Sequence, residues 1–164
     1  MNAEQKLRNL GIVLPGSSAR RAMYLPPVKR LGNTLFISSL PLINSKPAYT
    51  GKVGVERTLA EAQEAAKICI VNILIAVKDF IGDLDQVVNI VELRAFVNID
   101  TGFLEQHLVL NTALQLLSDV FGNAGQHIYT TVGTDQNKLL LDSTIEIEIV
   151  LEIKYKGSAV FNFR

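Results

Sequence analysis

The sequence predicts one α+β domain in which two helices cover one face of a mostly antiparallel sheet. Residues 144–154 alternate between isoleucine or leucine and largely polar side chains, the two-residue period of a strand with one buried face. Residues 58–81 and 103–121 have helical apolar patterns, and each segment is followed by a glycine that can end a helix. The predicted order is hairpin, helix, strand, helix, strand, strand, which a single sheet with both helices on one side can accommodate.

The N-terminal part of the chain is predicted to hold a short helix and an edge hairpin. Residues 3–10 fit a helix, and residues 14–18 are expected to form a loop. The extended segment 23–30 contains two adjacent prolines without backbone N–H groups, so we expect it at a sheet edge or beside a bulge. A Gly-Asn turn at 32–33 joins it to the apolar strand 34–38.

The middle of the chain is predicted to contain a loop followed by a long helix. Residues 41–56 show little periodicity and indicate a long surface loop, a kind of segment that commonly carries function or an interface. Thr58 and Glu61 have the spacing of a capping box at a helix N-terminus. The stretch 68–77 is apolar on nearly all sides, so we expect more than one neighbour to cover it.

The second half is predicted to contain a central strand over 87–97, a helix over 103–121 and a short strand over 129–132. Asp100 or Thr101 is the expected cap of that helix. Its expected inward stripe comprises Leu104, Leu108, Asn111, Leu114 and Leu117. Both helices should cover the isoleucine face of the last strand, which leaves the opposite face of the sheet to water or to a second subunit.

Composition limits the function classes. The 164 residues suffice for one domain, and 48% are hydrophobic, which favours a second subunit over water on the open sheet face. The formal net charge is zero, which disfavours nucleic-acid binding. The single cysteine, Cys69, lies in an apolar run and indicates a reducing compartment. Without a signal-peptide pattern or an apolar run of membrane-spanning length, we expect a cytoplasmic protein with no membrane partner.

Four motifs together resemble the RidA/YjgF superfamily, and the loop Tyr49-Thr50-Gly51-Lys52-Val53-Gly54, with the N-terminal helix, resembles its longer, less characterised branch. The four motifs are Tyr24-x-Pro26-x-Val28-x-x-x-Gly32-Asn33-x-Leu35-Phe36-Ile37-Ser38, then Gly82-Asp83-Leu84-Asp85-x-Val87-Val88, then Phe96-Val97-Asn98 followed by Phe103 and Asn111, and finally Ile145-Glu146-Ile147-Glu148. No single motif is specific, but their order and spacing extend over nearly the whole chain.

The resemblance implies a chorismate-mutase-like fold of the bacillus type that assembles as a homotrimer, with a small-molecule pocket at each subunit boundary. In the well-studied branch this pocket hydrolyses reactive enamines and imines. There an arginine clamps the substrate carboxylate and a glutamate helps to position the attacking water. The chain divides accordingly into an N-terminal helix and loop (1–22), a RidA-like domain (23–154) and a C-terminal tail (155–164).

Three family positions are kept in this sequence and two are altered. Glu146 matches the acidic residue, Tyr24 the pocket tyrosine and Asn111 an asparagine. Tyr129 stands where the arginine is expected, so the two-point grip on a carboxylate is lost. The Ser-Gly-Gln turn of the family reads Ser38-Ser39-Leu40-Pro41 here.

The predicted ligand-binding set is completed by residues that adjoin these positions. It comprises Tyr24, Ser38, Ser39, Asn111, His127, Tyr129, Thr130 and Thr131, with Glu146 as the candidate catalytic residue. The competing interpretation of the tyrosines is ordinary packing. Glu146 and Glu148 share one face of a strand, and their alternative role is an interface pair bonded to Arg94 or to lysines. No metal or cofactor is expected, because the two histidines have no cluster of further ligands around them in sequence.

Two function hypotheses remain open. One is a trimeric binding protein that holds a small metabolite without chemistry, and the missing arginine favours it. The other is a hydrolase, an imine or enamine deaminase that uses Glu146 and water. Ribonuclease activity, which has been attached to some relatives, is disfavoured by the neutral charge and by the absence of a His/Lys/Arg cluster.

Overall fold

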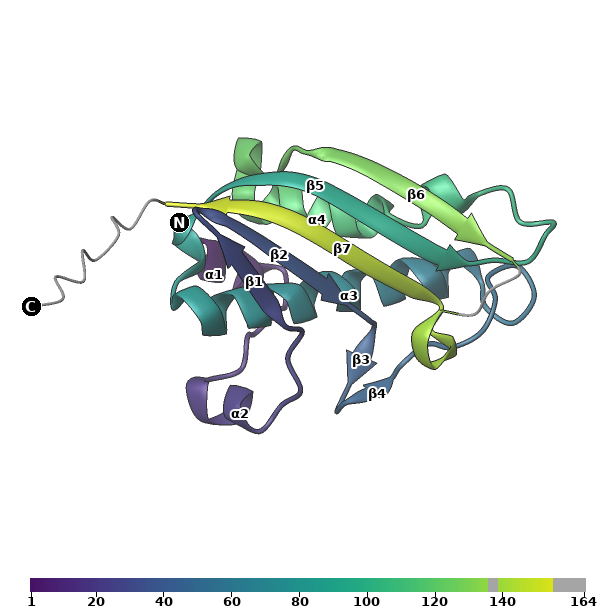
Figure 1. Ribbon diagram of the computed structural model, residues 1–164, viewed down its shortest axis with the longest axis horizontal. Helices are drawn as coiled ribbons and strands as arrows, with labels where there is room; N and C mark the ends of the chain where they lie inside the picture. The colour runs from purple at the N-terminus through teal and green to yellow at the C-terminus, as the bar shows by residue number, and fades with distance from the viewer. Residues whose placement is uncertain (136–138, 155–164) are drawn as a thin grey trace, which may run out of the picture.

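The computed structural model describes residues 1–135 and 139–154 and confirms the predicted α+β architecture. Its five-stranded sheet has the spatial order β1-β2-β7-β5-β6 (Figure 1). The strands are β1 (Val28–Leu31), β2 (Thr34–Ser39), β7 (Ile145–Ile153), β5 (Val87–Asn98) and β6 (Ile128–Thr134). Neighbouring strands are antiparallel except for the β5–β6 pair, which is parallel. The proline-preceded strand β1 lies at a sheet edge, as predicted.

The helices form a second layer behind the sheet in Figure 1. The two long helices are α3 (Leu59–Ile81) and α4 (Asn111–Phe121). The short helix α1 (Ala3–Asn9) contacts α4 and buries Leu7, and α2 (Ser17–Arg21) contacts α3. Short 3-10 turns occupy η1 (Leu84–Gln86), η2 (Gln106–Leu108), η3 (Gly122–Gly125) and η4 (Leu140–Asp142).

Strict alternation in β7 separates the core from the open face of the sheet. Ile145, Ile147, Ile149, Leu151 and Ile153 are buried, whereas Glu146, Glu148 and Val150 are half-buried and Glu152 is exposed. The buried set packs with α3, whose core-facing side is rich in alanine and isoleucine. Small side chains on α3 let the helix lie close to the sheet, because packed layers approach according to the size of the residues between them.

The capping box of α3 is present as predicted. The Thr58 hydroxyl accepts the Glu61 backbone N–H, and the Glu61 carboxylate accepts the Thr58 backbone N–H. That backbone hydrogen bond from Thr58, helped by Arg57, holds the pKa of Glu61 below its usual value. The helix ends at Gly82, whose φ of 86° is accessible to glycine without a steric penalty.

The predicted start of the second long helix was wrong. It begins at Asn111 and not near Phe103, and neither Asp100 nor Thr101 caps it. Residues 99 and 100 instead bond to distant backbone: the Asp100 N–H donates to the Val53 carbonyl at 2.9 Å.

The buried side of α4 also differs from the predicted one. Its buried side chains are Ala113, Leu116, Leu117 and Val120. Of the stripe predicted from sequence, only Leu117 is buried, while Leu104 is 79% exposed and Asn111 is exposed.

Two segments predicted as loops contain additional structure. The stretch 14–18 includes the start of α2. The stretch 41–56 contains the small hairpin β3 (Leu42–Ile43) and β4 (Lys46–Pro47), turned by Asn44 and Ser45 with positive φ angles. Further along it, Val53 is fully buried and pairs with Ile99. This stretch is therefore packed against the domain and is not a simple surface loop. The predicted tail 155–164 lies outside the described residues.

Candidate functional site

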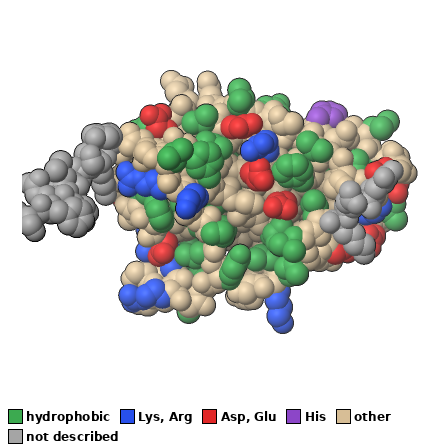
Figure 2. All heavy atoms as spheres, viewed as in Figure 1, with side chains coloured by type: hydrophobic (Ala, Val, Ile, Leu, Met, Phe, Trp, Pro, Cys, Tyr) green, Lys and Arg blue, Asp and Glu red, His purple; other side chains and the backbone are tan. Residues whose placement is uncertain are grey.

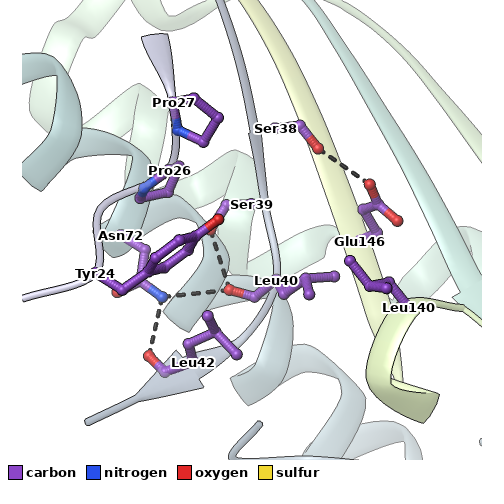
Figure 3. Close-up of a pocket in the computed structure, with 10 residues that line it drawn as sticks. All are labelled: Tyr24, Pro26, Pro27, Ser38, Ser39, Leu40, Leu42, Asn72, Leu140 and Glu146. Carbon is purple, nitrogen blue, oxygen red and sulfur yellow. Dashed lines mark hydrogen bonds between the residues drawn. The ribbon is translucent and has the colours of Figure 1, made fainter. Parts of the chain in front are cut away.

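A pocket of about 170 Å³ lies where β2 ends and β7 begins (Figure 3). The segment before β1 closes one side, α3 contributes one side chain, and η4 contributes another. Its lining residues are Tyr24, Pro26, Pro27, Ser38, Ser39, Leu40, Leu42, Asn72, Leu140 and Glu146. Four residues predicted from the sequence, Tyr24, Ser38, Ser39 and Glu146, are thus brought together in one chain.

Glu146 is held by its neighbour on β2. The alternation of β7 directs Glu146 away from the isoleucine core, and the Ser38 hydroxyl donates to its Oε1 at 3.0 Å (Figure 3). Within the described residues, no hydrogen bond or ion pair engages Glu146 Oε2. The carboxylate is therefore fixed in orientation through one oxygen and has acceptor capacity left on the other.

Two further polar side chains of the pocket, Ser39 and Asn72, donate their hydrogens to backbone carbonyls (Figure 3). The Ser39 hydroxyl donates to the Leu40 carbonyl at 3.0 Å. The Asn72 amide nitrogen donates to the carbonyls of Leu40 at 3.3 Å and Leu42 at 3.0 Å. Asn72 thereby ties α3 to the segment that leaves β2.

Glu148, two residues along the same strand, has different surroundings. Its Oε2 lies 3.3 Å from Arg94 Nη2, and Arg94 Nε lies 3.8 Å from Glu92 Oε1. The alternative interpretation of an ion pair with Arg94 therefore applies to Glu148. Glu146 carries no such pair within the described residues, which distinguishes the two carboxylates.

The open face of the sheet carries apolar side chains between charged ones (Figure 2). Phe36 of β2 is 41% exposed and pairs in register with Val150 of β7. Val132 of β6 pairs with Phe96 of β5 on the same face. A shallow depression beside the pocket is also lined by Phe36, together with Arg94. No helix of the described chain covers this face (Figure 1).

The predicted residues of β6 form a second group, separate from Glu146. Tyr129 pairs with the buried Leu93 of β5, so it lies on the helical side of the sheet, at the edge strand. Thr131 shares that side, whereas Thr130 pairs with Arg94 on the open face. Glu146 and Tyr129 therefore lie on opposite faces of the sheet and cannot meet within one chain.

Two polar atoms in this second group lack partners. His127 Nδ1 lies 2.6 Å from the Gly125 carbonyl, and the His127 ring meets the Tyr129 ring edge-on at 6.5 Å. His127 Nε2 and Thr131 Oγ1 are both buried without a hydrogen-bond partner. Buried polar atoms are normally hydrogen-bonded, and these two lie below the surface of the chain, out of direct reach of an external group.

Asn111 lies in neither group. It lines a depression among α1, α3 and α4, together with Ile12, Lys67 and Asp119. The structure thus does not bring Asn111 to Glu146.

Sequence reasoning missed the pocket residues Asn72, Leu140 and the two leucines that follow β2. Asn72 had a detectable signal, because it is the one polar residue in the apolar stretch 68–77 of α3.

The described residues also bear on metal binding, membrane insertion and the chemistry of the cysteine. Residues 1–135 and 139–154 contain no group of three potential metal ligands placed to bind an ion. Within the same part of the chain, no helix combines the length and hydropathy that a membrane span requires. Burial raises the pKa of the Cys69 thiol well above its usual value, so this side chain packs as an apolar residue.

Comparison with known proteins gives consistent matches. The family model described as "YjgF/chorismate_mutase-like, putative endoribonuclease" matches residues 4–146. The protein TCP17 of Trypanosoma cruzi is 34% identical over 90% of this chain and 91% of its own length. The crystal structure of protein Atu1372 from Agrobacterium tumefaciens is 38% identical with a TM-score of 0.81, covering 93% of this chain and 92% of that one. A Shewanella oneidensis structure is 25% identical with a TM-score of 0.82, covering 93% and 100%.

Proposed function

Because this chain belongs to the YjgF/chorismate mutase-like family, we propose that it is a homotrimer that binds a small metabolite in a pocket between subunits. The observation that carries the proposal is the convergence of Tyr24, Ser38, Ser39 and Glu146 on one cavity. In this proposal the ligand is held without the arginine that clamps carboxylates in the well-studied branch.

The open face of the sheet supports the trimer. Phe36, Val150 and Val132 give it an apolar component, and a stable protein rarely leaves a broad apolar sheet face to water. The salt bridge between Arg94 and Glu148 gives it a polar component whose charges are already paired. Such a mixed surface is typical of interfaces between subunits.

The separation of the two residue groups supports a shared pocket. Tyr129 and Thr131 lie on the edge strand β6, whereas Glu146 lies on the central strand β7, on the opposite sheet face. In this proposal a neighbouring copy brings its β6 edge, with the exposed Tyr129, to this chain's cavity. The pocket would then be complete only in the assembly.

A second candidate function, deamination of an imine, is favoured by one observation. Glu146 Oε2 is without a partner in the described residues and belongs to a carboxylate held in place by Ser38. In the reaction, Glu146 takes a proton from water while the oxygen adds to the iminium carbon. The resulting aminol takes that proton from Glu146 onto its nitrogen. The C–N bond then breaks while the hydroxyl proton returns to the Glu146 carboxylate, which gives a carbonyl compound and ammonia.

The experiment measures assembly, binding and turnover on the same preparation. Light scattering should give the mass of three chains, and small metabolites that bind should raise the melting temperature. Ammonia release from freshly generated imines is then compared between the wild type, Glu146→Gln and the control Glu148→Gln. Turnover lost only in Glu146→Gln supports the deaminase, and binding without turnover supports the binding protein. A monomer at micromolar concentration contradicts both, because the shared pocket would not exist.

The same proposal includes a cytoplasmic location and no nucleic-acid partner. The one cysteine of the chain is buried and reduced, and the net charge is zero. A ribonuclease would need a cationic surface to bind its substrate, so incubation with RNA should give no cleavage above a buffer control.

A further inference from the structure

We infer that the pocket at Glu146 selects a small ligand with a positively charged, hydrogen-donating head, such as an ammonium or iminium group, on an apolar body. Carboxylates should be excluded. This inference rests on the proposed function, since it concerns the ligand of the same cavity. Three properties of the lining residues lead to it: their charge, the direction of their hydrogen bonds and the size of the space they enclose.

The charge of the pocket is negative. Glu146 is the single ionisable acid among the ten lining residues, and no lysine, arginine or histidine is among them. Arg94 lies on the same sheet face but is already engaged by Glu148 and Glu92. Within the pocket lining, an anionic ligand would therefore meet a carboxylate without a compensating cation, whereas a cation would form a charge-assisted hydrogen bond. Lys29, which pairs with Phe36 on this sheet face, lines the neighbouring depression and not the pocket.

The hydrogen-bonding capacity of the pocket also favours a hydrogen-donating ligand. The hydroxyl of Ser38 donates to Glu146, that of Ser39 donates to a backbone carbonyl, and both described bonds of the Asn72 amide nitrogen also run to carbonyls. These side chains thus have oxygen lone pairs left for a ligand. Tyr24 is the one lining side chain whose hydroxyl hydrogen has no described acceptor. A ligand that donates several hydrogen bonds fits this arrangement better than one that accepts them.

The space and its walls define the rest of the ligand. An apolar cavity of roughly 150 Å³ is known to hold benzene, and this pocket encloses about 170 Å³. Its apolar lining consists of Pro26, Pro27, Leu40, Leu42 and Leu140. The ligand body is therefore a small ring or branched chain, too small for a nucleotide.

The proposed trimer would not reverse this charge preference. The β6 residues that a neighbour could bring, Tyr129, Thr130 and Thr131, include no lysine or arginine, and the Nε2 atom of the preceding His127 is buried. They would add hydroxyl groups around the head of the ligand but no cation. Glu146 is kept from the family pattern while Tyr129 replaces the arginine, so the loss of that one cation turns a site for an acid into a site for an amine.

The test uses three probes of similar shape and different heads: cyclopentylamine, cyclopentanol and cyclopentanecarboxylate. Their dissociation constants are measured by NMR titration at neutral pH on the full-length protein, following the signals of Ser38 and Tyr24. Loss of a charge-assisted hydrogen bond weakens binding by about tenfold to a hundredfold, so the alcohol should bind that much more weakly than the amine. The carboxylate should bind weakest of all.

Two variants connect the preference to its cause. Glu146→Gln keeps the shape and removes the charge, so the amine should lose its advantage over the alcohol. Glu148→Gln removes a charge two residues away on the same strand, and the preference for the amine should persist. Equal or tighter binding of the carboxylate, or an amine preference that survives Glu146→Gln, would overturn the inference.

The outcomes also separate this inference from the proposed function. A trimer that binds the carboxylate best contradicts the amine preference but retains the shared pocket. A monomer in which the amine still shifts Ser38 contradicts the shared pocket but retains the preference. If no probe binds at millimolar concentration, the inference fails, and the proposed function is then decided by light scattering and the metabolite melting assay.

Discussion

Truncation of Phe36 to alanine tests whether the open sheet face is an interface. Phe36 is 41% exposed in the single chain and lies opposite Val150 in the middle of that face. A phenylalanine offers about 200 Å² of surface, so about 80 Å² would become buried on assembly. At about 25 cal/mol per Å², this corresponds to about 2 kcal/mol for each subunit. Three copies then contribute about 6 kcal/mol, which is about four powers of ten in the trimer association constant.

The assay is sedimentation equilibrium over a wide range of protein concentrations, with circular dichroism to show that each variant is folded. The wild type should remain trimeric at micromolar concentration, and Phe36→Ala should dissociate at concentrations where the wild type does not. Leu10→Ala is the matched control, because Leu10 is 43% exposed and lies at the end of α1 in the helical layer. A Phe36→Ala variant that associates as strongly as the wild type would refute the reasoning.

Four further predictions concern the elements that position the site, and each is measured by denaturant unfolding. Ile149→Ala should lower the free energy of unfolding by about 2–5 kcal/mol, because Ile149 is buried between β7 and the helices; a loss below 1 kcal/mol would place it outside the core. Thr58→Ala should cost about 1 kcal/mol through the lost helix cap. Since the folded-state pKa of Glu61 is lowered, the stability difference between wild type and Glu61→Gln should be present near neutral pH and shrink as the pH falls through that pKa; a pH-independent difference would be evidence against the capping bond. Gly125→Ala should cost about 1–3 kcal/mol because the new Cβ would lie 2.3 Å from a backbone carbonyl of α4, whereas Gly16→Ala, with open space around it, serves as the neutral control.

The sequence alone predicted the elements that depend on residues close together in the chain. The alternation of β7 predicted which side chains are buried, because a strand with one covered face must repeat every two residues. The Thr58–Glu61 spacing predicted the start of α3, because a capping box lies within one turn. The start of α4 was not predictable in this way. Its preceding segment bonds to Val53, about fifty residues away, and no local pattern records that contact.

The residues of the candidate site were also predictable only in part. The resemblance brought Tyr24, Ser38 and Glu146 to attention, and the structure places them on one cavity. Asn72 and Leu140 reach the same cavity from α3 and η4, and only the packing of these elements reveals it. The direction of the hydrogen bonds in the pocket was also beyond the sequence, because a serine hydroxyl can donate or accept until its neighbours are known.

A crystal structure of the assembled protein tests the central proposal most directly. The account predicts three copies with the open sheet faces turned inward, and a cleft in which Tyr129 of one copy faces Tyr24 and Glu146 of the next. Within one chain these residues lie on opposite faces of the sheet, so their meeting requires two copies. An assembly in which Phe36 remains in solvent, or in which no cleft joins Glu146 to a neighbour's β6 edge, would contradict the account.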